Sequence, residues 1–174
     1  KDKDKIAFKK SISNGIQLRY GENPHQKGYF YGNINDLFEK IQGKEISYNN
    51  LLDIEAGIYL IDEFNEPTFA ILKHNNPCGL ASANTIFEAW KLALSADPVS
   101  AFGGILISNN TIDEKTAEDI NQLFFEVIIA PFYTDKAIEI LSSKKNRIIL
   151  KRKNLSLPIV QFRSLLNGII ELDR

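Results

Sequence analysis

The sequence of 174 residues contains no methionine, one cysteine and two histidines. The single cysteine, Cys78, excludes a disulfide framework and fits a reducing cytosol, so a cytoplasmic protein is expected. Two histidines and one cysteine are too few for a closed structural zinc site of the usual Cys/His type. No apolar run approaches the ~20 residues of a membrane-spanning helix. The formal net charge of −1 gives no general attraction to nucleic acid or to a membrane surface.

The remaining composition is that of an ordinary globular domain, with 44% hydrophobic and 25% charged residues. A chain of this length buries roughly 70% of its unfolded surface and needs neither disulfide nor metal to fold. The lack of methionine indicates a piece of a longer protein. Residues 1–14 are lysine-rich and are expected to be a linking segment, which leaves residues 15–174 for the folded domain.

Short apolar runs alternate with longer amphipathic segments along the chain. This alternation predicts a three-layer α/β/α fold around a mainly parallel sheet. Strands are expected at 27–32, 68–72, 105–107, 127–130, 147–150 and 169–172. Helices are expected at 50–64, where Asn49 or Asn50 is the cap, and at 85–95, 113–123 and 134–141.

Ligands of such sheets bind beyond the carboxyl ends of the strands. Four segments are assigned to such positions: 73–75, 101–104, Pro131 and the basic run after Leu150. We therefore expect these four segments to converge on one crevice.

The pair Lys73-His74 is the first candidate for chemistry, because it follows a buried strand and precedes a Pro-Gly turn. A histidine there can act as a general base, and a lysine can stabilise a developing oxyanion. The alternative is a structural histidine at a strand end.

Arg19 and Tyr20 are the second candidate, because a guanidinium beside a phenol can bind a phosphate. The alternative is a surface arginine beside a core tyrosine.

Other segments give weaker signals. Asn49-Asn50 offers amides beside a helix start, which plain capping also explains, and 102–104 lets backbone approach a ligand. Neither a Rossmann fingerprint nor a P-loop occurs. The basic residues between 144 and 153 attract an anion or form a solvated corner. Pro77-Cys78 is shared with zinc deaminases, but residue 81 is Ala, so the second cysteine ligand is missing.

Five motifs in one order are far more specific than any of these signals: LRYGENPHQ (18–26), GKEISYNNLLDIEA (43–56), KHNNPCG (73–79), DPVSAFGG (97–104) and FFEVIIAP (124–131). Together they resemble the transformylase part of the AICAR transformylase/IMP cyclohydrolase family. The resemblance implies formyl transfer from 10-formyltetrahydrofolate to the 5-amino group of AICAR, a purine ribonucleotide precursor. It implies a cytidine-deaminase-like fold without zinc, and a reaction that requires no metal.

The resemblance also implies roles for single residues. It makes His74 the group that assists removal of a proton from the amine, and Lys73 the stabiliser of the transition state. It implies substrate-binding roles for Arg19, Tyr20, Asn50, Gly103 and Glu126.

The resemblance further implies that residues 15–174 are the first subdomain of the transformylase region. In this family a cyclohydrolase domain precedes the region, a second subdomain follows, and a homodimer shares its active sites. The chain alone is therefore expected to have little or no transformylase activity. Two other hypotheses stay open: a non-catalytic nucleotide-binding or assembly module, and a zinc nucleoside deaminase.

Overall fold

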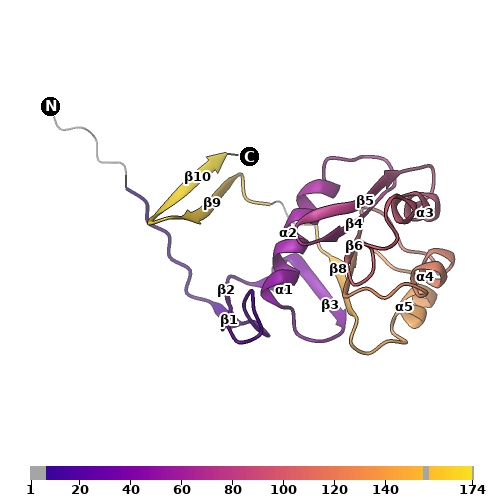
Figure 1. Cartoon of the computed structure of the whole chain (residues 1–174), viewed down its shortest axis with the longest axis horizontal. Helices are drawn as coiled ribbons and strands as arrows, with labels where there is room; N and C mark the ends of the chain where they lie inside the picture. Colours follow the sequence, from indigo (N-terminus) through magenta and orange to yellow (C-terminus); the bar gives the residue numbers. More distant parts are fainter. Residues whose placement is uncertain (1–6, 155–156, 174) are drawn as a thin grey trace.

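A computed structural model describes residues 7–154 and 157–173. A six-stranded sheet forms the body of the molecule, with helices on both faces and two separate two-stranded hairpins beside it (Figure 1). In order across the sheet, the strands are β3 (Phe38–Gln42), β8 (Ile148–Arg152), β7 (Val127–Ala130), β6 (Ile105–Ser108), β4 (Thr68–Lys73) and β5 (Asn76–Ser82). The helices are α1 (Ile34–Leu37), α2 (Tyr48–Ile61), α3 (Ile86–Ala96), α4 (Glu114–Ile120) and α5 (Asp135–Leu141).

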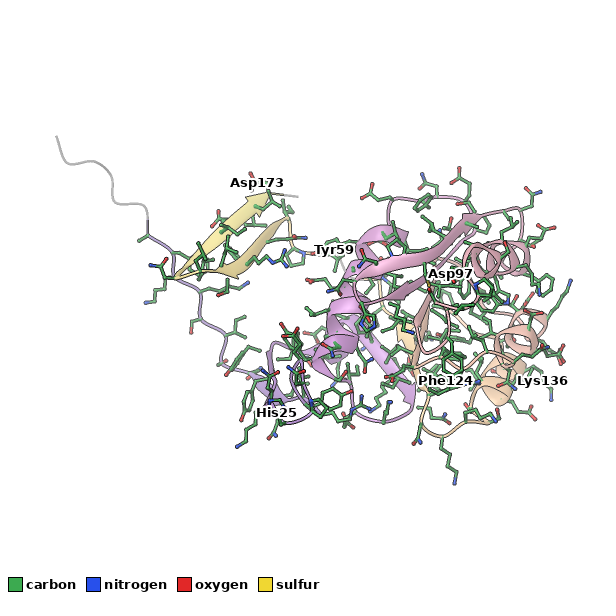
Figure 2. The ribbon with its side chains drawn as sticks, viewed as in Figure 1. His25, Tyr59, Asp97, Phe124, Lys136 and Asp173 are labelled. Atoms are coloured by element: carbon green, nitrogen blue, oxygen red, sulfur yellow. The ribbon has the colours of Figure 1, made fainter. Side chains whose placement is uncertain are left out.

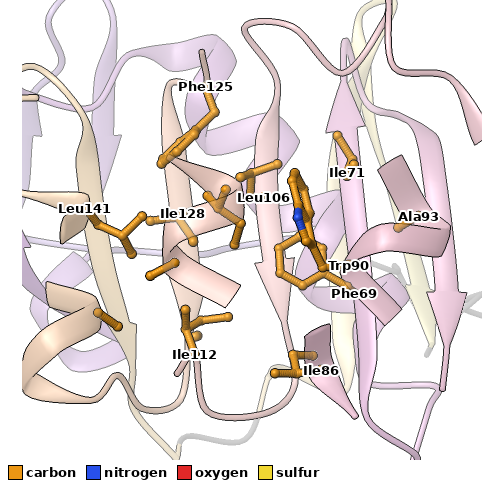
Figure 3. Packing of buried hydrophobic residues seen from close by; sticks show 14 of the residues in the cluster. Phe69, Ile71, Ile86, Trp90, Ala93, Leu106, Ile112, Phe125, Ile128 and Leu141 are labelled. Atoms are coloured by element: carbon orange, nitrogen blue, oxygen red, sulfur yellow. The ribbon is translucent and has the colours of Figure 1, made fainter. Parts of the chain in front are cut away.

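Side chains alternate between the two faces of the strands and build one hydrophobic cluster on each face. In β4, Phe69 and Ile71 belong to the cluster under α3, α4 and α5, where Phe69 meets Trp90 edge-on at 5.0 Å (Figure 3). Ala70 and Leu72 belong to the cluster under α2. These two clusters make the three layers of the predicted α/β/α architecture.

The sheet is mixed in direction. Strands β6, β7 and β8 are parallel, as predicted, but β4 is antiparallel to β6, and the edge strands β5 and β3 are antiparallel to β4 and β8. A loop of only two residues, His74 and Asn75, joins β4 to β5, and so short a loop permits only an antiparallel pair. The Pro-Gly turn expected after Lys73-His74 is therefore wrong, because Pro77 and Gly79 lie within strand β5. Strand β3 was not predicted at all.

Capping side chains define the helix starts. Ser47, not Asn49 or Asn50, is the N-cap of α2, and it forms a capping box with Asn50. Asp113 caps α4, and Thr134 caps α5. The helix predicted at 50–64 begins two residues after α2 begins and ends three residues beyond it, and the helix predicted at 113–123 ends three residues beyond α4; the other two predictions agree within one residue at each end. Such differences are usual for boundaries predicted from sequence.

The two hairpins lie outside the sheet. Strands β1 (Gly15–Gln17) and β2 (Tyr29–Tyr31) form the first, and β9 (Val160–Leu165) and β10 (Gly168–Asp173) form the second, which projects from the body (Figure 1). The predicted strand at 169–172 lies in β10. Residues 7–14 form neither helix nor strand, and residues 1–6 of the expected linker lie outside the described residues. Within the described part of the chain, no helix is both long and apolar enough to cross a membrane.

Candidate functional site

The direction of β4 decides which segments meet. Because β4 is antiparallel to β6, its carboxyl end at Lys73 lies beside the amino ends of β6, β7 and β8. We call this side of the sheet, along which these strand ends lie, the site edge. The loop 101–104 and Glu126, which precede β6 and β7, therefore lie at this edge. Pro131 and the basic run after Leu150 follow β7 and β8 and lie at the opposite edge. The predicted convergence of four segments is wrong for these last two.

Lys73 and the loop before β6 are in contact. Lys73 Nζ donates a hydrogen bond to the backbone oxygen of Phe102 (2.9 Å), and the Gly103 N–H donates to the backbone oxygen of Phe124 (2.8 Å). Gly103 has a φ of +75°, a left-handed conformation that favours glycine. An ideal Cβ there would meet only the Phe124 ring, at 3.6 Å. Gly103 is thus required by its backbone conformation rather than by lack of space.

Glu126 is the centre of a cluster of charged and polar side chains. Its Oε2 accepts a hydrogen bond from Asn50 Nδ2 (3.2 Å) and lies 3.3 Å from Lys44 Nζ and 4.0 Å from Arg19 Nη2. We call these four residues the Glu126 cluster. Three predicted site residues, distant in sequence, are thereby brought together. Lys44 was missed, because nothing in the GKEISYNN motif distinguishes it from other surface lysines.

Asn50 has two sets of contacts, one at the start of α2 and one with Glu126. Its Oδ1 accepts the Ser47 N–H (3.2 Å) as part of the capping box, while its Nδ2 reaches Glu126. An amide group has two N–H donors, so Asn50 keeps one for a ligand. Asn50 is therefore both a structural residue of α2 and a member of the Glu126 cluster.

Arg19 and Tyr20 pair with each other. Arg19 Nη2 donates to Tyr20 Oη (2.8 Å), and the guanidinium lies 4.6 Å from the centre of the Tyr20 ring. The Tyr48 N–H donates to the backbone oxygen of Tyr20 (3.3 Å), which anchors this segment at the start of α2. Arg19 Nε is buried and has no hydrogen-bond partner among the described residues. The Arg19 side chain as a whole is 25% exposed, so the outer part of its guanidinium remains within reach of an anionic ligand.

His74 is exposed in the turn between β4 and β5. Its φ of +54° is left-handed, as is that of Asn75 at +61°. The His74 backbone oxygen accepts from Asn76 Nδ2 (2.8 Å). In the described parts of the chain, its imidazole forms no hydrogen bond with the Glu126 cluster. The structure thus places His74 next to Lys73 at the site edge without joining it to the carboxylate.

A cavity of about 680 Å³ adjoins the Glu126 cluster. Its basic lining residues are Lys44, Lys144, Lys145 and Arg147. Arg147 is buried, and burial lowers the pKa of its guanidinium; it donates to the backbone oxygens of Asn121 (3.2 Å) and Leu123 (3.1 Å).

The predicted basic cluster is therefore divided between the two edges of the sheet. Its second half interacts away from the site: Lys151 lies 3.9 Å from Glu39, and Arg152 binds Asp62 through both terminal nitrogens.

The Pro77-Cys78 pair lies in β5. Cys78 Sγ donates weakly to the backbone oxygen of Ile71 (3.5 Å), and burial raises the pKa of its thiol. Across residues 7–154 and 157–173, no group of three or more His, Cys, Asp and Glu side chains is arranged to hold a metal ion.

The chain matches known proteins along its whole length. A family model described as AICARFT/IMPCHase bienzyme matches residues 1–174. A bifunctional purine biosynthesis protein PurH of Bacteroides thetaiotaomicron is 65% identical over 168 residues, which cover 97% of this chain and 33% of that protein. The PurH protein of Acetivibrio thermocellus is 49% identical over 148 residues, covering 82% of this chain and 29% of that protein. The chain thus spans about a third of the length of these curated relatives.

Proposed function

The chain belongs to the AICARFT/IMPCHase bienzyme family, and from this premise we propose that its site serves formyl transfer from 10-formyltetrahydrofolate to the 5-amino group of AICAR. One observation carries the proposal: the Glu126 cluster unites Arg19 and Asn50 at the sheet edge that also holds Lys73. The chain spans about a third of the length of its relatives, so we assign formyl transfer to the whole protein and not to these 174 residues alone. We propose that the whole protein also has IMP cyclohydrolase activity, which resides in another part of it.

The Glu126 cluster suits the nucleotide. The Arg19 side chain is partly exposed, and its guanidinium gives a phosphate a charge-assisted hydrogen bond. Tyr20 holds that guanidinium in place through its hydroxyl. The Glu126 carboxylate accepts hydrogen bonds from ligand hydroxyls, and Lys44 at 3.3 Å balances its charge. The free N–H of Asn50 faces the carboxamide, and Gly103 lets backbone approach the ligand.

Lys73 and His74 suit the chemical step. The amine nitrogen attacks the formyl carbon, the folate nitrogen leaves, and one proton moves from the amine to that leaving nitrogen. His74 accepts the amine proton, and such acid–base help is worth roughly 10²–10⁴-fold. Lys73 uses one of its three N–H donors on Phe102 and keeps the others for the oxyanion of the tetrahedral intermediate. These steps need no metal ion.

The finer structural assignments are part of the same proposal. We assign residues 15–174 to the first subdomain of the transformylase region, with a cytidine-deaminase-like α/β/α fold that lacks zinc. The three layers and the mixed sheet support this assignment. The rest of the folate site comes from other parts of a cytoplasmic homodimer.

A full-length chimaera tests the function. In it, the 174 residues replace the matched segment of the Bacteroides thetaiotaomicron relative, and turnover of AICAR with 10-formyltetrahydrofolate is measured. His74→Ala is expected to lower kcat by roughly 10²–10⁴-fold while AICAR still binds. His25→Ala is the matched control, because His25 is the other exposed histidine and lies in the loop before β2 (Figure 2).

Two results would contradict the proposal. An unchanged rate in His74→Ala removes His74 from the mechanism. AICAR binding without any turnover in the unaltered chimaera favours the non-catalytic nucleotide-binding module.

A further inference from the structure

We propose that Asp53 is a positioning residue for His74, acting from α2 on the turn that carries the imidazole; this inference rests on the formyl transfer proposed above. Asp53 Oδ1 accepts the N–H of Asn75, the residue after His74, at 2.5 Å. Asp53 lies in the second turn of α2, far in sequence from the turn it holds. It thereby adds a hydrogen bond at the β4–β5 turn to the apolar packing of α2 on β4.

The β4–β5 turn needs such an anchor. Both of its residues have positive φ, +54° at His74 and +61° at Asn75, and neither is glycine. Two-residue hairpin turns with positive φ at both positions favour Asn-Gly and similar pairs. Histidine and asparagine adopt positive φ more often than most residues, but it is uncommon for any residue other than glycine, so contacts around the turn help to fix it. Asn76 Nδ2 holds one side of the turn through the His74 backbone oxygen, and Asp53 holds the other through the Asn75 N–H.

The same helix also carries the nucleotide-binding side of the site. Asp53 follows Asn50 by three residues, and side chains three apart are neighbours on a helix surface. Asn50 reaches Glu126 from this face, while Asp53 reaches the His74 turn. Helix α2 is in turn fixed on the sheet through the buried residues Ile54 and Ile58. The distance between the base and the nucleotide anchor is therefore set by one rigid helix face.

This arrangement predicts an effect on kcat and not on substrate binding. A misplacement of about 1 Å between reacting groups costs on the order of 10²-fold. We expect Asp53→Ala in the full-length chimaera to lower kcat about 10- to 100-fold, while the Kd for AICAR, measured by calorimetry, changes less than about threefold. Asp53→Asn retains an oxygen acceptor for the Asn75 N–H, so it is expected to recover most of the rate.

The controls separate positioning from folding. Glu55→Ala removes an exposed carboxylate two positions further along α2, roughly on the opposite side of the helix, and is expected to leave kcat unchanged. Loss of thermal stability and AICAR binding together with kcat in Asp53→Ala overturns the inference, because the residue is then structural. An unchanged kcat in an active chimaera, or an Asp53→Asn variant as slow as Asp53→Ala, also overturns it.

A second measurement does not depend on activity. Amide hydrogen exchange of Asn75 in the 174-residue chain is expected to be at least about tenfold faster in Asp53→Ala than in the unaltered chain, because the amide loses its acceptor. Equal exchange rates refute the anchor. An unaltered chimaera without formyl transfer refutes the proposed function instead, while the exchange result still decides whether Asp53 holds the turn.

Discussion

Gly57 lets α2 lie directly on the sheet, and alanine at this position tests how close that contact is. An ideal Cβ at Gly57 would overlap Cδ1 of Ile107 in β6 and lie 3.1 Å from Cδ1 of Leu72 in β4. An extra methyl group in a packed core costs about 1–3 kcal/mol, whereas glycine to alanine within a helix gains about 0.5–1 kcal/mol. We expect Gly57→Ala to lower the free energy of unfolding by about 1 kcal/mol.

A second substitution makes this prediction specific. Ile107→Val removes the Cδ1 atom that an alanine methyl at position 57 would meet. Alone, Ile107→Val is expected to cost about 0.5–1.5 kcal/mol. Combined with Gly57→Ala it should restore near-wild-type stability, because the new methyl fills the vacated space, which gives a coupling of about 1.5–2.5 kcal/mol.

Thermal unfolding of the 174-residue chain, followed by circular dichroism, measures both effects. One kcal/mol shifts the Tm of a chain of this size by about 2–4 °C. A Tm that rises in Gly57→Ala would show that helix propensity outweighs the contact and that α2 does not lie as close as described. Strictly additive effects in the double variant would refute the role of Ile107.

Two further predictions concern the chain as a whole and the loop before β6. The isolated 174-residue chain is expected to show little or no formyl transfer from 10-formyltetrahydrofolate to AICAR, and a rate like that of the full-length relative would refute its assignment as one subdomain. The Ser100 hydroxyl and N–H donate to Asp97 (2.6 and 2.9 Å) and hold the pKa of that carboxyl below its usual value of 3.8. This interaction stabilises the fold above the usual pKa and is lost as the pH falls through the lowered one. Ser100→Ala should therefore raise the pKa of Asp97 in an NMR titration, and an unchanged pKa would contradict this cause.

The sequence predicted the buried strands of the fold but not its edges. Strands β4, β6, β7 and β8 are runs of apolar residues buried on both faces, and such runs are visible without any structure. β5 contains Pro77 and Gly79, which indicate a turn, and only its edge position allows a proline. β3 alternates polar and apolar residues too weakly to be distinguished from a loop.

The candidate site, like the fold, was predicted from the sequence only in part. The motifs contain every residue of the Glu126 cluster, yet only the antiparallel direction of β4 determines which of them meet. Lys44 and Asp53 lie within the motif at 43–56 and were not singled out, because their significance depends on partners 82 and 22 residues away. Local pattern cannot reveal such pairs. The chemical roles of Lys73 and His74 stay predictions.

The pairing of β3 with β8 has a consequence for how the protein is made. Phe38 is opposite Arg152 in the finished sheet. A ribosome that adds about 5–20 residues per second needs on the order of 5–20 s to make the chain between them. During that interval the nascent chain carries α2 with its apolar face, but neither Glu126 nor the partner strand of β3 is complete. The Glu126 cluster is therefore incomplete until Glu126 itself has been made, and β3 stays without its partner strand until β8 emerges.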